Sequence, residues 1–379
     1  MSITGSQRHL FDIPDDVTYL NAAYLTPQPG TVRRAGLGAL DRADAPWTIA
    51  VDDFFAPVER LRGLFADLIG ADAEGVAIIP SVSYGAGIAA ANLKVGPGRT
   101  VVVLEEQFPA NVYPWRSAVT GGGGEMVTVA RPSDGMWTPS VLETIDAQTA
   151  VVAVPNVHWT DGSLLDLAQV GAAARQVGAA LVIDASQSLG AMPFDAGEIR
   201  PDFVFAAGYK WLLGPFGLGY LWVSPDYRQG TPLEQGWIVR AGSEDFAGLV
   251  DYRDQYAPGA RRYDVGERSS FQLIPMAMAA IEQLLDWGVD HVATALQGIT
   301  DAIERAADER GLLVVPPQAR GPHLIGVRAA SGLPTGVAAE LAARRVYVSI
   351  RGDSIRVAPH LYNDQSDVDR LFSVLDEVL

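Results

Sequence analysis

Cysteine is absent from all 379 residues of the sequence. Its absence excludes disulfides, a thiolate metal site and a thiol nucleophile. Long apolar runs are missing too, because none approaches the roughly 18 residues that a membrane-spanning helix needs. The polar N-terminal stretch MSITGSQRHLFDIPDD does not have the pattern of a signal peptide. We therefore expect a cytoplasmic protein that spans no membrane, and no motif in the sequence predicts a metal site.

Basic residues are scarce relative to acidic ones, with 28 Lys and Arg against 45 Asp and Glu. The resulting net charge of −17 argues against partners that expose phosphate, namely nucleic acids and anionic membrane surfaces. Hydrophobic residues make up 48% and charged residues 19%, which is typical of a globular protein. The length predicts about two domains and a large core.

Short apolar runs alternate with helix-like segments along the first two thirds of the chain, which predicts βαβ units and a mainly parallel sheet. Asp166 is expected at the N-cap of one such helix, which continues to Val177. The four glycines 121–124 favour a flexible connection over a phosphate-binding loop, because no Lys-Ser/Thr pair follows them. Seven strands are predicted: Val76–Ile79, Val101–Leu104, Met126–Val129, Val151–Val154, Leu181–Ile183, Phe203–Ala206 and Gly219–Val223.

Two of these runs end next to side chains of opposite charge. Asp184 follows Leu181–Ile183, and Lys210 comes shortly after Phe203–Ala206. Ligands of open α/β sheets bind beyond the carboxyl ends of the strands, so both side chains are expected to face one cleft. An amine that forms an imine and a carboxylate that keeps a ring nitrogen protonated would suit pyridoxal phosphate. On this pair alone, a structural ion pair is an equally good interpretation.

The residues around the pair carry a family resemblance. Asp184-Ala-Ser-Gln187, Gly208-Tyr209-Lys210 and the glycine-rich run 214–219 resemble the class V aminotransferases, pyridoxal phosphate enzymes of fold-type I. This family includes cysteine desulfurases, kynureninases and isopenicillin epimerase-like enzymes, although the desulfurase cysteine is absent here. The resemblance implies an α/β fold with a large domain (residues 16–263) built on a mainly parallel seven-stranded sheet. It also implies a smaller α+β domain (residues 1–15 and 264–379) and a homodimer with shared active sites.

The resemblance assigns cofactor-binding roles beyond Asp184 and Lys210. The helix N-terminus after Val76–Ile79 would bind the phosphate through the Val82 N–H and the Ser83 hydroxyl, although an ordinary serine N-cap is the alternative. The Tyr209 hydroxyl is a further phosphate ligand. Phe108 would cover the ring unless it is simply a core residue, and Gln187 would donate to the phenolic oxygen. Ser269 or Ser270 would replace the family's threonine that reaches the partner subunit's phosphate.

Substrate recognition is assigned in the same way. Arg356 matches the family arginine that binds the α-carboxylate, and guanidinium suits a carboxylate through two parallel hydrogen bonds. The opening motif Tyr19–Tyr24 places Ala23 and Tyr24 near the same carboxylate. Further pocket residues are expected to be Trp159, Trp237 and Arg240.

Several reactions fit this set of residues. The missing thiol excludes desulfuration of the usual kind, which needs a thiolate acceptor. A transaminase generally needs a second cation for a distal carboxylate, and Arg240, Arg268 and Arg351 are candidates without a recognised motif. We therefore favour an amino-acid lyase, in which Lys210 moves the proton, over a transaminase. A non-catalytic cofactor-binding protein is a weaker alternative, and a nicotinamide dehydrogenase is weaker still because the run 214–219 has the wrong glycine spacing.

Overall fold

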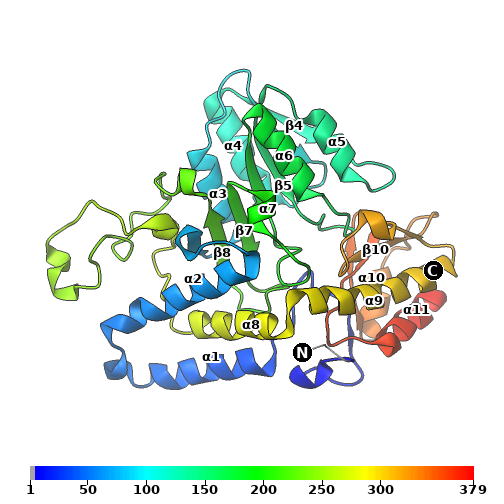
Figure 1. Cartoon of the computed structure of the whole chain (residues 1–379). Coiled ribbons are helices and arrows are strands. Elements are labelled where there is room, and N and C mark those ends of the chain that lie inside the picture. Colours follow the sequence, from blue (N-terminus) through cyan, green and yellow to red (C-terminus); the bar gives the residue numbers. More distant parts are fainter. Residues whose placement is uncertain (1–4) are drawn as a thin grey trace.

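A seven-stranded sheet forms the centre of the computed structural model, which describes residues 5–379 (Figure 1). The strand order is β2-β8-β7-β6-β5-β3-β4, and every pair is parallel except the two that involve β8. The predicted fold class and the mainly parallel seven-stranded sheet are therefore confirmed. The strands are β2 (Val76–Ile79), β3 (Thr100–Leu104), β4 (Glu125–Val129), β5 (Thr149–Pro155), β6 (Ala180–Asp184), β7 (Phe203–Ala207) and β8 (Gly219–Val223).

The central strands are apolar on both faces because helices cover both sides of the sheet. Along β6, Val182 joins the cluster under helices α3 and α4, whereas Ile183 joins the cluster under α2, α5, α6, α7 and α8. Buried parallel strands need such continuous apolar runs, which explains why the sequence revealed them. The helices are α1 (Gly30–Ala43), α2 (Ala56–Ile69), α3 (Val82–Asn92), α4 (Tyr113–Gly122), α5 (Trp137–Thr144), α6 (Leu167–Val177), α7 (Ala196–Ile199), α8 (Leu273–Trp287), α9 (Val289–Asp308), α10 (Val337–Ala343) and α11 (Gln365–Val378).

One local prediction is confirmed and one is wrong. Asp166 caps α6, because its side chain accepts a hydrogen bond from the Gln169 N–H at 3.0 Å. The glycines 121–124, in contrast, are not a flexible connection: α4 continues to Gly122, and Gly123 caps it with φ of 80°. A Cβ atom on Gly122 would lie 2.1 Å from the Val95 carbonyl oxygen. Close packing against the preceding loop therefore requires glycine here.

The C-terminal part of the chain contains a second, smaller sheet with the order β12-β13-β10-β9, in which all pairs are antiparallel. Helices α9, α10 and α11 pack on it and share its separate apolar cluster. The N-terminal strand β1 (Thr18–Tyr19) pairs with β11 (Val346–Tyr347), so the start of the chain contacts this region. The remaining strands are β9 (Leu313–Val314), β10 (Ile325–Arg328), β12 (Ser349–Arg351) and β13 (Ser354–Val357).

The division of the chain into residues 16–263 and the rest stays a prediction, and two contacts bear on it. Strand β1 lies after residue 15 yet pairs with the C-terminal part. Helix α8, which follows residue 264, packs on α1 and α2 and shares the core of the central sheet. In Figure 1, α8 lies beside α1 and leads into α9, which spans toward the smaller sheet.

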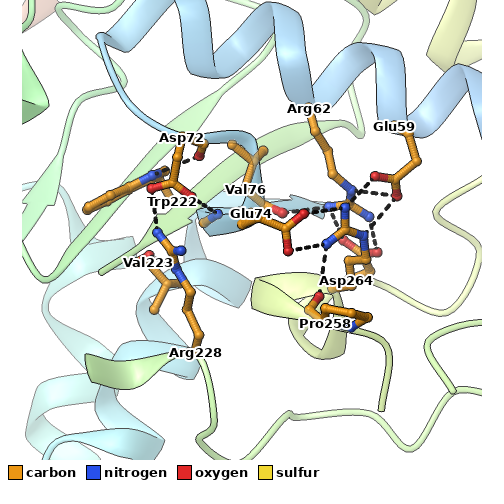
Figure 2. A network of polar contacts seen from close by, with 12 residues as sticks. Glu59, Arg62, Asp72, Glu74, Val76, Trp222, Val223, Arg228, Pro258 and Asp264 are labelled. Carbon is orange, nitrogen blue, oxygen red and sulfur yellow. Dashed lines mark hydrogen bonds and ion pairs between the residues drawn. The ribbon is translucent and has the colours of Figure 1, made fainter. Parts of the chain in front are cut away.

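A buried network of charges fixes the chain at Asp264 (Figure 2). The Asp264 carboxylate accepts hydrogen bonds from the Ile78 N–H at 2.8 Å and from the fully buried Arg62 of α2. Arg62 also donates to the Val76 carbonyl at 2.6 Å, so the network connects α2 and β2 to the segment that leads into α8. Arg268 completes the network with a hydrogen bond of 3.2 Å to Asp264.

Among the described residues, no helix is long and apolar enough to cross a membrane.

Candidate active site

Lys210 and Asp184 lie at one cavity beyond the carboxyl ends of two adjacent strands. Asp184 is the last residue of β6, and Lys210 lies in the turn that follows β7. This turn is tight, since Gly208 accepts a hydrogen bond from the Gly214 N–H at 2.8 Å and donates to Leu218 at 2.9 Å. The parallel pairing of β6 with β7 brings the two side chains to the same edge of the sheet. The predicted convergence is what the structure shows.

Burial shifts the pKa values of both groups. Desolvation, with a smaller contribution from the charges of Arg356 and Arg351, lowers the pKa of the Lys210 amine to about 8, although Asp184 opposes the shift. Desolvation raises the pKa of the Asp184 carboxyl, although hydrogen bonds from Ser186 oppose this effect. An amine with a pKa near neutrality is partly unprotonated, so Lys210 can act as a nucleophile and as a base.

The N-terminus of α3 faces the same cavity. Ser81 is the N-cap, and its hydroxyl accepts a hydrogen bond from the Tyr84 N–H at 3.3 Å. Within residues 5–379, no group accepts the N–H of Val82 or of Ser83, so both remain available to an anion. Gly85 allows α3 to lie directly on the sheet, because a Cβ atom there would be 2.9 Å from the Phe205 Cβ. Serine capping, the alternative considered for this motif, belongs to Ser81, and the Ser83 hydroxyl lies 3.1 Å from the Ser81 hydroxyl beside the same cavity.

Aromatic rings form the walls of the cavity. The Lys210 Nζ lies 5.2 Å from the centre of the Phe108 ring, which is 37% exposed and thus not a core residue. Phe108 packs edge to face on Trp159 at 5.4 Å. On the other side, the Tyr209 ring packs against Phe216 at 4.5 Å. A flat ring ligand between these walls would be held by stacking.

Gln187 lines the cavity and is oriented by its neighbours. Its amide nitrogen donates to the Ala23 carbonyl at 3.1 Å, and its oxygen accepts from the Trp211 indole at 2.8 Å. One amide hydrogen remains for a ligand. Among the residues that line the cavity, Gln107 and Ser186 are polar side chains to which the sequence analysis assigned no role. The Ser186 N–H donates to the Asp184 carboxylate at 3.0 Å, and although Ser186 lies within the motif Asp184–Gln187, no role was assigned to it.

Arg356 on β13 is buried, at 2% exposure, and donates to the Trp159 carbonyl at 2.9 Å. Its Nε and second terminal nitrogen have no partner in the described part of the chain, which is unusual for a buried cation. Burial lowers the pKa of Arg356 to about 9, and the nearby charge of Arg351 contributes. A carboxylate ligand would satisfy these nitrogens. The nearby Tyr24 is 54% exposed, and its charge partly opposes the desolvation that lowers the pKa of the Arg351 guanidinium.

The structure does not bring Trp237 and Arg240 to Lys210. Both line a separate hollow in the irregular segment 229–258, which protrudes from the body in yellow-green in Figure 1. Arg240 donates to the Asp254 carbonyl at 2.7 Å and to Gln235 at 2.8 Å.

The hydroxyls of Ser269 and Ser270 both have partners within this chain. The Ser269 hydroxyl donates to the Phe54 carbonyl at 2.6 Å, and the Ser270 hydroxyl accepts from the Leu273 N–H at 3.3 Å. Their role toward a partner subunit stays a prediction.

Comparisons with known proteins find a family model and relatives that match most of the chain. The family model described as aminotransferase class-V matches residues 50–371. An uncharacterized aminotransferase of Bacillus subtilis, YcbU, is 32% identical over 314 residues, which cover 82% of this chain and 80% of its own. The kynureninase of Deinococcus radiodurans is 28% identical over 332 residues, which cover 83% of this chain and 77% of the kynureninase. Among solved structures, a C-DES mutant with glycine linked to its pyridoxal phosphate superposes with a TM-score of 0.89 at 19% identity, covering 98% and 100% of the two chains.

Proposed function

We propose that this chain, which belongs to the class V aminotransferase family as its sequence predicted, is a pyridoxal 5′-phosphate-dependent enzyme that acts on an α-amino acid. The observation that carries the proposal is the convergence of Lys210, Asp184 and the free N-terminus of α3 on one cavity. When bound, pyridoxal phosphate supplies an aldehyde that reacts with amines and a ring that takes up electrons. The donors around the cavity fit this group, because each of its polar atoms has a complementary residue.

Different residues of the cavity would hold different parts of the cofactor. The Val82 and Ser83 N–H groups, the Ser83 hydroxyl and the Tyr209 hydroxyl hold the phosphate. Asp184 holds the ring nitrogen in its protonated form, and Phe108 packs on the face of the ring. Gln187 donates its remaining amide hydrogen to the phenolic oxygen.

Two further residues act on the amino acid. Arg356 binds the α-carboxylate with its two unpartnered nitrogens, near Ala23 and Tyr24. Lys210 would hold the cofactor through a covalent bond from its Nζ, and its amine, once released from that bond, would accept a proton from the substrate and return it. A pKa of about 8 suits this acid–base role at neutral pH. Trp159 closes the pocket with an apolar wall.

For the reaction we favour a lyase, which releases ammonia or cleaves a bond to the side chain of the amino acid. The sequence has no cysteine to accept sulfur. The turn between β12 and β13, which precedes Arg356 in the chain, is also too short to carry a mobile nucleophile. The similarity to a kynureninase supports this choice. An aminotransferase is the second candidate, and the position of Arg351 beside Arg356 favours it, because a transaminase needs a second cation for a distal carboxylate.

A panel of amino acids tests both reactions in one experiment. The purified holoenzyme is incubated with each amino acid, with and without an added oxo-acid, while ammonia, oxo-acid products and the cofactor spectrum are followed. We expect ammonia and a cleaved product without any oxo-acid. Turnover that stops after one molecule of amino acid per active site and resumes when an oxo-acid is added would establish an aminotransferase instead. Lys210→Ala should abolish every product, whereas Lys94→Ala, at an exposed lysine, serves as the matched control.

The assembly of the protein belongs to the same proposal. We expect a homodimer in which Ser269 or Ser270 reaches the phosphate of the partner site. Light scattering of the holoenzyme measures the mass directly. A monomer of 40.4 kDa that retains full activity would exclude a shared site.

A further inference from the structure

Three arginines are candidates for a second substrate-binding cation, and the structure distinguishes them. Arg268 is buried against carboxylates, with Asp264 at 3.2 Å and Glu59 at 3.6 Å. Arg240 donates to Asp254 and Gln235 in the protruding segment, away from Lys210. Arg351 remains, and it lies beside the active site. Its guanidinium is 5.5 Å from the centre of the Trp159 ring, which lines the cavity.

Arg351 and Arg356 project from the same face of one hairpin. Strands β12 and β13 pair antiparallel, with Ser349 opposite Arg356 and Arg351 opposite Ser354. Because side chains alternate between faces along a strand, the two arginines are diagonal neighbours on one face. Both guanidinium groups lie over the same Trp159 ring, at 5.5 Å for Arg351 and 6.0 Å for Arg356. The hairpin therefore presents two positive charges to one aromatic wall.

No carboxylate of the described chain neutralises the charges of Arg351 and Arg356. Neither arginine forms an ion pair within residues 5–379, and the Nε atoms of both are buried without a partner. The one side-chain hydrogen bond of Arg351 goes to the adjacent Ile350 carbonyl at 2.8 Å. Two unpaired cations in a partly dry site repel each other, and each lowers the stability of the other's charged form. Such an arrangement is typical of a site that binds anionic groups.

We infer that Arg351 is a specificity-determining residue that binds a second carboxylate, carried by the side chain of the amino-acid substrate. Arg356 then binds the α-carboxylate, and Trp159 lies beneath both guanidinium groups. This inference rests on the proposed function, because it assigns the ligand of the same site. It holds for a lyase and for an aminotransferase, since either reaction begins with removal of the proton from the α-carbon of a substrate whose distal carboxylate is already bound.

Binding of unreactive acids tests the inference without turnover. Succinate, glutarate and adipate are compared with butyrate, valerate and hexanoate, which have the same lengths and one carboxylate fewer. Dissociation constants are measured on the holoenzyme by calorimetry. We expect at least one dicarboxylate to bind about 10- to 150-fold more tightly than its partner, which is the range for hydrogen bonds to charged groups.

Two variants locate the effect. Arg351→Met should abolish the preference for the dicarboxylate and leave binding of the monocarboxylate unchanged. Arg328→Met is the matched control, because Arg328 lies on β10 of the same sheet but pairs with Asp353 outside the site; this variant should retain the preference. If Arg351→Met weakens both classes of acid equally, the two arginines share one carboxylate and the inference is overturned. An absence of any preference in the unmodified enzyme overturns it as well.

Turnover supplies a second readout and separates the inference from the proposed function. The ratio of kcat/KM for aspartate over asparagine, and for glutamate over glutamine, should favour the acid and fall to about one in Arg351→Met. A holoenzyme that converts amino acids without preferring the acid contradicts only the inference. A holoenzyme that prefers the dicarboxylates but converts no amino acid contradicts the proposed catalytic function instead, and leaves the role of Arg351 in place.

Discussion

The reactivity of Lys210 provides a quantitative prediction. A lysine amine with the ordinary pKa of 10.5 is unprotonated in about one molecule in a thousand at pH 7.5. With the pKa of about 8 in this site, about a quarter of the molecules carry the neutral amine, a gain of roughly 240-fold. The main cause is desolvation, and the charges of Arg356 and Arg351 add to it. Replacing Arg356 with methionine removes one of those charges, so the pKa should rise to a value between about 8 and 10.5.

Competitive labelling of the cofactor-free protein with a trace of acetic anhydride measures this pKa. The sequence has two lysines, so the exposed Lys94 is the reference amine within the same molecule. The label on Lys210 and the label on Lys94 are each followed by mass spectrometry from pH 6 to pH 11. Limited access of the reagent to Lys210 scales its rate at every pH and leaves the midpoint unchanged.

The labelling of Lys210 should rise with a midpoint near pH 8 and move upward in Arg356→Met, but not in Arg328→Met. A midpoint for Lys210 near pH 10.5 in the unmodified protein would refute the account of desolvation. An unchanged midpoint in Arg356→Met would refute the electrostatic contribution of the arginine.

Three further changes have defined outcomes. Asp184→Asn should lower kcat by several orders of magnitude while the cofactor stays bound, because an unprotonated ring is a poor electron sink; a loss under roughly tenfold would mean that Asp184 has another role. Arg356→Met should cost about 1.5–3 kcal/mol in kcat/KM for amino acids through the lost charged hydrogen bonds; normal kinetics would remove it from substrate binding. Asp264→Ala should lower the free energy of unfolding in urea by about 3–5 kcal/mol, because it leaves Arg62 buried without its main partner. Asp353→Ala, at an exposed carboxylate 3.9 Å from Arg328, should change it by about 0.5 kcal/mol or less, and equal losses in the two variants would contradict the role of the buried network.

The central sheet could be predicted because most of its strands are buried on both faces and therefore leave continuous apolar runs in the sequence. β8 is an example, since its predicted and observed bounds coincide. Asp184 and Lys210 were predictable for a related reason: each follows such a run, and the ends of neighbouring parallel strands meet at one edge. The glycines 121–124 were misread because their role depends on the approach of Val95, about 27 residues earlier in the chain, which no local pattern encodes.

The roles of the arginines could not be predicted from the sequence. Arg268 pairs with Asp264, four residues away, and with the distant Glu59. Arg351 is distinguished by its position over Trp159, a contact between residues that are far apart in the chain. Arg240 and Trp237 were assigned from the family resemblance alone. Their protruding segment lies apart from the cavity of its own chain, so a single chain offers no contact that would test the assignment.

The covalent attachment of the cofactor is the most direct test of the central claim. The holoenzyme is treated with borohydride, digested, and its peptides are sequenced by mass spectrometry. With two lysines in the chain, the label has two possible positions. We predict visible absorbance that disappears on reduction and a pyridoxyl phosphate group on the peptide that contains Lys210. A protein that shows no such absorbance, or that carries the group on Lys94 alone, would contradict the assignment of Lys210 and with it the proposed function.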